Sequence, residues 1–269
     1  MQTTTLKRWI SLAVLAYATF SASSAFAQAQ GLAAVGPTDP ADGYPAWYQD
    51  TTGLQLAQCL VSPSDPAPVP DPCALTGTLP NDGAPVVFPS NFPNEFFYWR
   101  GVSKINGVGA GGGGRASLIL GLEGAFGGPT ATVADGNGAQ IVFSRLRIVA
   151  NGLTPGATYS FTHPYGVTRL VADSKGQAKF TDDFGCLAAP CNFSAVLPTH
   201  NVGPFLTWDP AVPPAAPAGF IGDPNVTHAI TGSPFGTNVF QVDGPNAGGA
   251  GINTISTDQF AITGKVFTP

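Results

Sequence analysis

The clearest strand signal in the chain is Ile141-Val142-Phe143-Ser144-Arg145-Leu146-Arg147-Ile148-Val149-Ala150. Successive side chains of a strand point to opposite faces, so the apolar Val142, Leu146 and Ile148 share one face. The opposite face carries Phe143, Arg145, Arg147 and Val149. The turn-forming sequence Asp135-Gly136-Asn137-Gly138 comes shortly before this stretch. This pattern predicts an antiparallel strand with one face in a core.

The two arginines of this strand point to the same, outward side. They can form a binding patch for an acidic ligand, or they can belong to a solvated face with carboxylate partners on neighbouring strands. We favour the second interpretation because cross-strand pairs of opposite charge are the commoner arrangement.

Short segments with strand character follow on both sides of this stretch. Leu118, Leu120 and Leu122 alternate with other residues, and the segment 92–99 is either a strand or a short helix capped by Asn94. Further strands are expected at 158–163, 167–173, 178–184, 228–231, 238–242 and 259–267. Since Gly and Pro turns separate them and helical periodicity is absent, we predict an all-β antiparallel β-sandwich, either Ig-like or jelly-roll-like.

The composition is rich in turn formers and poor in charge. The chain of 269 residues has 34 glycines and 26 prolines, with 43% hydrophobic and 10% charged residues. The apolar share suffices for a core, which argues against a disordered chain. The few lysines and arginines argue against a nucleic-acid partner.

The first 27 residues have the order of parts found in a secretory signal peptide. Lys7 and Arg8 precede an apolar stretch, and Ala25-Phe26-Ala27 supplies an A-x-A cleavage site. We therefore expect a secreted or periplasmic protein, whose formal net charge becomes −7 instead of −5 once Lys7 and Arg8 are removed. No later apolar run reaches the length of about 20 residues that a transmembrane anchor needs.

The expected organisation is a signal peptide (1–27), an irregular Pro-rich arm (28–95) and a β-sandwich body (96–269), with a subdivision near 201–220 as the alternative. Four cysteines allow three disulfide connectivities. The simplest uses the two local pairs, Cys59 with Cys73 and Cys186 with Cys191. A metal site is the alternative use of these cysteines, but the C-x2-C spacing of a zinc site is absent.

The segment Leu153-Thr154-Pro155-Gly156-Ala157-Thr158-Tyr159 resembles a turn of fibronectin type III and related immunoglobulin-like sandwiches. The resemblance implies that the Tyr159 hydroxyl bonds back to a nearby backbone group and fixes a corner between sheets. It covers fewer than twenty residues, so it bears on architecture only.

Sequence motifs for catalysis are missing. The chain has neither a G-x-S-x-G nor an H-E-x-x-H sequence, and its only glutamates are Glu95 and Glu123. A three-histidine metal site from His163, His200 and His228 would require these distant residues to meet. We expect no cofactor, with structural calcium as an alternative whose weak candidate ligands are Asp135, Asn137, Asp182 and Asp183.

These observations favour a noncatalytic secreted protein that acts by binding or assembly at the cell surface or in the extracellular matrix. Its expected partner is a neutral glycan, a cell-surface component or another copy of itself. Planar rings can stack on sugars or anchor an interface. The candidate contact residues are Trp47, Tyr48, Trp99, Tyr165 and Trp208.

The alternative is a hydrolase or lyase of extracellular polymers. Its site would combine dispersed residues, such as Asp183, Arg145 or Arg147, and a histidine such as His163.

Overall fold

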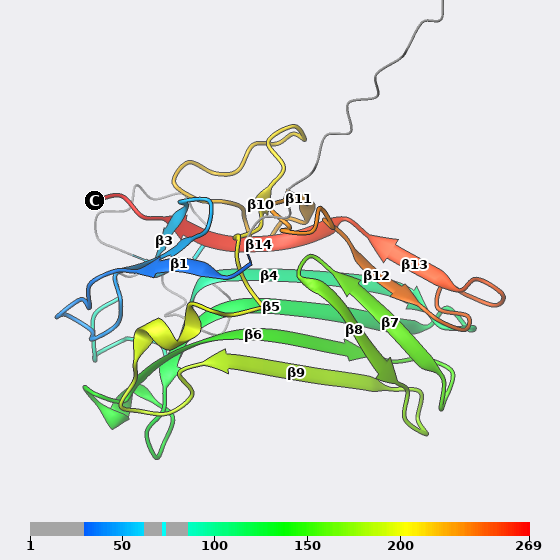
Figure 1. The fold of residues 1–269 in the computed structure, drawn as a ribbon, viewed down its shortest axis with the longest axis horizontal. Helices are drawn as coiled ribbons and strands as arrows, with labels where there is room; N and C mark the ends of the chain where they lie inside the picture. Colours follow the sequence, from blue (N-terminus) through cyan, green and yellow to red (C-terminus); the bar gives the residue numbers. More distant parts are fainter. Residues whose placement is uncertain (1–29, 62–71, 74–85) are drawn as a thin grey trace, which may run out of the picture.

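A computed structural model describes residues 30–61, 72–73 and 86–269. Nearly all regular structure in these residues is β, and the strands form two antiparallel sheets (Figure 1). The large sheet has the order β1-β2-β3-β14-β4-β5-β6-β9, with β10 and β11 attached beside β14. The small sheet has the order β13-β12-β7-β8. The predicted all-β antiparallel sandwich is confirmed.

The strands of the large sheet are β1 (Leu32–Val35), β2 (Trp47–Asp50), β3 (Gln55–Ala57), β4 (Glu95–Val108), β5 (Gly114–Phe126), β6 (Gln140–Ala150), β9 (Ala178–Gly185), β10 (Thr207–Trp208), β11 (His228–Thr231) and β14 (Gln259–Val266). The small sheet contains β7 (Thr158–His163), β8 (Gly166–Val171), β12 (Phe240–Asp243) and β13 (Thr254–Thr257). Two short 3-10 helices, η1 (Val133–Asp135) and η2 (Phe193–Val196), lie in connections.

The strand quoted first, β6, lies inside the large sheet between β5 and β9. Val142, Leu146 and Ile148 are almost fully buried, as their alternation predicts. These three residues define what we call the inward face of the large sheet. The opposite face is called the outward face. Because paired residues of antiparallel strands share a face, the register extends these two faces over the whole sheet.

The small sheet covers one end of the inward face. In Figure 1, β7 and β8 cross obliquely in front of the large-sheet strands, with β12 and β13 beside them. Phe161 of β7 stacks on Phe240 of β12 at 6.4 Å between ring centroids, and both rings are buried in the core that the two sheets share. Burial of this continuous apolar layer is the main force that holds the sandwich together.

The region expected to be an irregular arm is more regular than its composition indicates. Its residues 32–57 form β1, β2 and β3, and β3 pairs with β14, which adds these strands to the large sheet. The buried side chains of Tyr48 and Leu56 anchor them. Within the segment 92–99, residues 95–99 begin the long strand β4, so the strand alternative is correct for them. Asn94 does not cap a helix there: its side chain accepts a hydrogen bond from Val133 N at 3.0 Å.

The tyrosine corner implied by the resemblance is present. The Tyr159 hydroxyl accepts a hydrogen bond from Thr154 N at 3.0 Å and donates one to Pro245 O at 2.6 Å. The hydroxyl thereby connects the turn before β7 with the turn after β12.

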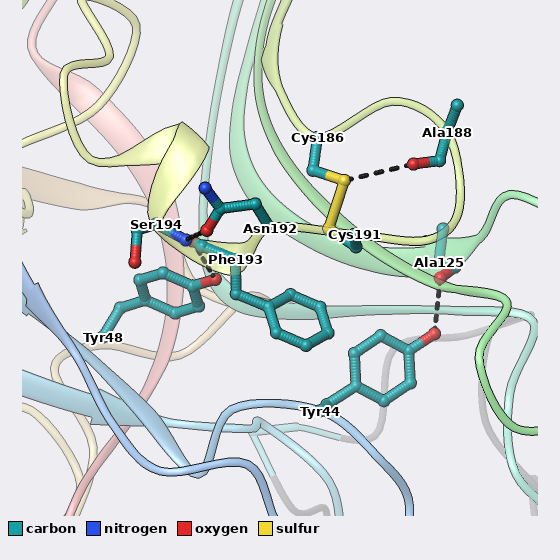
Figure 2. Close-up of a disulfide and its surroundings, with 9 residues drawn as sticks. All are labelled: Tyr44, Tyr48, Ala125, Cys186, Ala188, Cys191, Asn192, Phe193 and Ser194. Atoms are coloured by element: carbon teal, nitrogen blue, oxygen red, sulfur yellow. Dashed lines mark hydrogen bonds between the residues drawn. A yellow bond between two sulfur atoms is a disulfide. The ribbon is translucent and has the colours of Figure 1, made fainter.

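Both disulfides use the local pairs, Cys59–Cys73 and Cys186–Cys191. Figure 2 shows the second disulfide beside η2, together with Tyr44 from the connection between β1 and β2 and Tyr48 from β2. The Tyr48 hydroxyl donates to Phe193 O at 3.0 Å, and the Tyr44 hydroxyl donates to Ala125 O. These bonds tie the connection between β1 and β2 to β5, and β2 to η2.

No helix in the described part of the chain is long and apolar enough to span a membrane.

Candidate functional site: the outward face and an adjoining cleft

Charged side chains gather on the outward face around Arg145 of β6. The Asp183 carboxylate on β9 accepts two hydrogen bonds from this guanidinium, at 2.7 and 2.9 Å. The carboxylates of Glu123 on β5 and Glu95 on β4 lie 3.0 and 3.7 Å from Arg145 Nη1. We call these four residues the Arg145 cluster. The interpretation that Arg145 has cross-strand carboxylate partners is confirmed.

Glu123 is the buried member of the Arg145 cluster, with a side chain that is 2% exposed. Burial raises the pKa of Glu123 to about 8, against the opposing effect of the Arg145 charge, and the Glu95 and Asp183 carboxylates raise it further. Glu123 Oε2 has no aligned hydrogen bond among the described residues, so its contact with Arg145 is a charge contact. The pKa of Arg145 is raised, chiefly by its hydrogen bonds to Asp183. Burial thus disfavours the charged form of Glu123, and the nearby Arg145 guanidinium offsets part of this effect.

A cleft of about 840 Å³ opens beside this face, over β3 and the C-terminal end of β14. Its walls are mainly apolar, and the residues that line it include the partly exposed Phe88, Phe220 and Phe267 and the buried Phe92. Its polar side chains include those of Asp39, Asp42, Gln58 and Lys265. A mainly apolar cleft of this size with a few polar groups is typical of ligand-binding sites.

The two aspartates of the cleft are held by local hydrogen bonds. The Asp42 carboxylate is 8% exposed and accepts from Tyr44 N at 2.9 Å and from the Gln58 amide at 3.4 Å. Burial is the main cause that raises the pKa of Asp42. The Asp39 carboxylate accepts from Ala41 N at 2.8 Å. A carboxylate has about four acceptor positions, so both retain capacity for a ligand.

Most of the aromatic contact residues predicted from the sequence lie in the core. Tyr48 and Trp99 are 0% exposed, Tyr165 is 5% and Trp208 is 6% exposed. Trp99 Nε1 donates to Leu206 O at 3.0 Å, and the Tyr165 hydroxyl donates to Pro204 O at 2.7 Å. These four rings contact the protein itself and offer no open face. Trp47 is partly exposed and packs on Phe267, at 6.0 Å between ring centroids.

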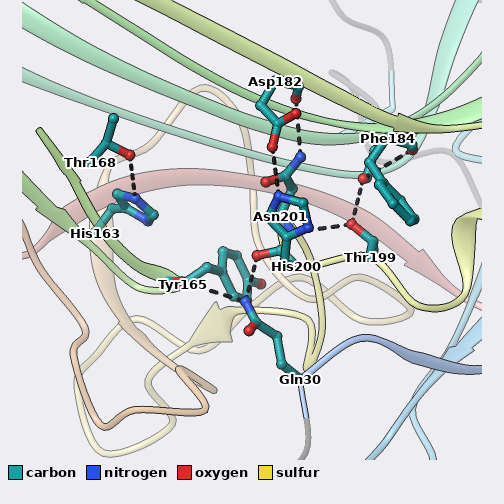
Figure 3. Close-up of polar contacts among 10 residues, drawn as sticks. Gln30, His163, Tyr165, Thr168, Asp182, Phe184, Thr199, His200 and Asn201 are labelled. Carbon is teal, nitrogen blue, oxygen red and sulfur yellow. Dashed lines mark hydrogen bonds and ion pairs between the residues drawn. The ribbon is translucent and has the colours of Figure 1, made fainter. Parts of the chain in front are cut away.

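The three histidines have separate surroundings. His200 Nε2 lies 2.7 Å from the Asp182 carboxylate on the inward side, where Asn201 donates to the Asp182 carbonyl (Figure 3). His163 Nε2 contacts the Thr168 hydroxyl, and burial lowers the pKa of His163 to about 4. His228 stacks on Trp208. The sequence alternative that combines His163 with Asp183 is therefore not assembled.

The weak metal candidates also have separate roles. Asp135 accepts hydrogen bonds from the Thr130 and Thr132 backbone at η1, and Asn137 accepts from the Gln140 amide. Asp182 and Asp183 point to opposite faces of β9, toward His200 and Arg145. Within residues 30–61, 72–73 and 86–269, no group of three or more His, Cys, Asp or Glu side chains is arranged to hold a metal ion.

Sequence reasoning did not identify Glu95 and Glu123 as neighbours. A signal was available for Glu123, because it continues the outward series of a strand whose leucines point inward. What was missing was the register that places β4 beside β5, with Glu95 opposite Ala125 and Phe97 opposite Glu123.

The structure thus defines an all-β sandwich with a charged outward face and an adjoining cleft. No protein-family model, no curated protein and no solved structure matches the chain.

Proposed function

We propose that this is a noncatalytic binding protein that acts outside the cytoplasm and takes a neutral glycan into the cleft over β3 and β14. The observation that carries the proposal is the cleft itself, whose aromatic walls and few polar groups suit one ring of a sugar. The secretory signal predicted at residues 1–27 and the two disulfides support a location outside the cytoplasm.

The chemistry of the cleft matches a neutral sugar in two ways. The rings of Phe220 and Phe267 offer apolar faces on which the C–H face of a sugar can pack. Asp39, Asp42 and the Gln58 amide offer acceptors for sugar hydroxyls. Trp47, whose ring contacts that of Phe267, is the one predicted aromatic contact residue that retains exposed surface.

The test is a glycan array with the purified protein, followed by calorimetry on the strongest neutral glycan. Phe267→Ala and Asp39→Asn are each expected to weaken binding at least about tenfold, because truncation of a central contact costs on the order of 2 kcal/mol. Matched controls are Phe235→Ala and Asp258→Asn, both on exposed surface away from the cleft, which should bind like wild type. Wild-type affinity in both cleft variants contradicts the proposed function.

The Arg145 cluster favours a second function, a hydrolase that uses Glu95 and Glu123 as its two carboxylates. A carboxyl of raised pKa beside a second one is the pair that glycoside hydrolysis requires. We rank this function lower because Glu123 is buried and the Arg145 guanidinium occupies the position next to both carboxylates. We expect no turnover on polysaccharide, ester or peptide panels. Turnover that Glu95→Gln abolishes would replace the binding function.

A further inference from the structure

Basic side chains are concentrated on one face of this acidic protein. All lysines and arginines except Lys7 and Arg8 lie in described residues, and the register places most of them on the outward face. These are Arg100, Lys104, Arg115, Arg145, Arg147, Lys179 and Lys265. The same strands carry Glu95, Glu123 and Asp183 outward. The outward face is therefore positive, although the formal net charge of the chain is −5.

The positive charge is concentrated away from the Arg145 cluster. Lys104, Arg115, Arg147 and Lys179 are all exposed, and we call them the basic quartet. They come from the four adjacent strands β4, β5, β6 and β9. Lys104 and Lys179 stand in one row, in which Ser117 and Val149 lie between them. Three strand spacings separate the ends of this row, which is about 14 Å.

The basic quartet is not neutralised within the described part of the chain. None of its members forms an ion pair with a carboxylate there. One acid, Asp173, interacts with Lys179 of the quartet at longer range. The pKa of Asp173 is lowered mainly by backbone hydrogen bonds from Gln177 and Lys175, and to a smaller extent by the charges of Lys175 and Lys179. Exposed cations without a carboxylate partner leave a surface that attracts anions.

We propose that the basic quartet binds an acidic polysaccharide, a linear polymer of carboxylated or sulfated sugars. The quartet spans four strands, so a linear polymer can contact several cations at once, whereas one small anion cannot. Thr181 is exposed and lies directly opposite Arg147 on β9. Its hydroxyl can donate a hydrogen bond to the carboxylate or sulfate oxygens of the polymer. Charges beyond about 8 Å are largely screened at physiological salt, so the local patch outweighs the negative net charge.

Other polyanions fit this face less well. A single-stranded nucleic acid needs aromatic rings on which its bases stack. The rows of Lys104, Arg147 and Lys179 otherwise contain Val102, Ser117, Ile119, Val149 and Thr181, and Arg115 lies opposite Asn106. None of these neighbours is aromatic. Each basic residue contributes only about 1 kcal/mol to binding at an anionic membrane. Among the described residues, no exposed large apolar side chain lies in β4, β5, β6 or β9 to serve as an anchor. The proposal is independent of the proposed function, because it uses different residues and an acidic polymer.

The test measures binding of the purified protein to polygalacturonate (carboxylated), dextran sulfate (sulfated) and neutral dextran. We expect binding to at least one acidic polymer at 50 mM salt, at least about tenfold weaker at 200 mM salt because counterions are released. Arg147→Glu should weaken binding at least about tenfold. The matched control is Arg169→Glu, an exposed arginine on the small sheet with the same change in charge, which should have less than about a threefold effect.

The proposal is overturned by no binding to either acidic polymer, by equal effects of Arg147→Glu and Arg169→Glu, or by equal binding to neutral dextran. Retention by single-stranded DNA or phosphatidylserine vesicles, without retention by acidic polysaccharide, also overturns it. Phe267→Ala should bind the acidic polymer like wild type. A failure of the cleft is thereby distinguished from a failure of the basic quartet.

Discussion

Glu123 is a buried acid whose ionisation is coupled to folding. Its ordinary pKa is 4.5, and burial raises this pKa to about 8 in the folded protein. Between these two values the folded state binds more protons than the unfolded state, so the free energy of unfolding falls as pH rises through this window. Within this window, ionisation of Glu123 lowers the free energy of unfolding by at most about 1.4 kcal/mol for each unit of pH. Above the folded-state pKa, the free energy of unfolding no longer changes with pH through this group.

Glu123→Gln replaces the carboxyl by a neutral group of the same shape. We expect the variant to gain stability relative to wild type progressively from pH 5 to 8. Urea unfolding at pH 5, 6.5 and 8 measures the difference. His163 has the opposite effect, because its lowered pKa makes the free energy of unfolding rise with pH from about 4 to 6.5. Both proteins contain His163, so its effect cancels in the difference between the variant and wild type. A difference that does not change with pH would contradict the assignment.

Residue types alone predicted part of the site. The alternation of residues 141–150 placed Arg145 and Arg147 outward and favoured carboxylate partners, and the structure gives Arg145 three of them. The sequence treated the two arginines alike, yet Arg147 has no carboxylate partner among the described residues. The difference arises from the residues opposite each arginine on β9, Asp183 and Thr181, which only the register reveals.

At the scale of elements, alternation predicted the strands that are long enough to show it. β6, β7, β8, β9 and β14 lie close to their expected bounds because each repeats the two-residue period several times. β1, β2 and β3 have only three or four residues each, in a region rich in proline and glycine, so their period is not visible in the sequence. They exist because β14 provides an edge to which β3 pairs.

The tyrosine corner is the element-scale contact that the sequence predicted best. Tyr159→Phe removes the hydroxyl that serves both Thr154 N and Pro245 O, and each group then loses a partner. We expect a loss of about 1–3 kcal/mol in the free energy of unfolding, measured by urea denaturation. The control is Ser160→Ala, at the next position, where the side chain points to the other face of β7 and the expected change is within about 0.5 kcal/mol. Equal stability of Tyr159→Phe and wild type would show that the corner is dispensable.

At the scale of the whole molecule, the order of strands brings both ends of the described chain into one sheet. β14, near the C-terminus, lies between β3 and β4, with Ala261 opposite Val102 and Lys265 opposite Ala57. The connection near 201–220 also packs inside: Phe205 N donates to the Asp50 carboxylate at 2.9 Å, and Leu206 O accepts from Trp99. A boundary between two domains would require few such contacts across it.

We therefore predict that residues 96–200 do not fold alone. This fragment lacks β14, which exposes the edge of β4, and it lacks β12 and β13, which reduces the small sheet to the hairpin of β7 and β8. An isolated two-stranded hairpin is marginally stable at best. The full chain should unfold in one transition, with near- and far-ultraviolet circular dichroism coinciding, while the fragment should show no near-ultraviolet signal and rapid proteolysis. A cooperative transition in the fragment would instead establish two modules, and the cleft and basic quartet would then belong to separately folding parts.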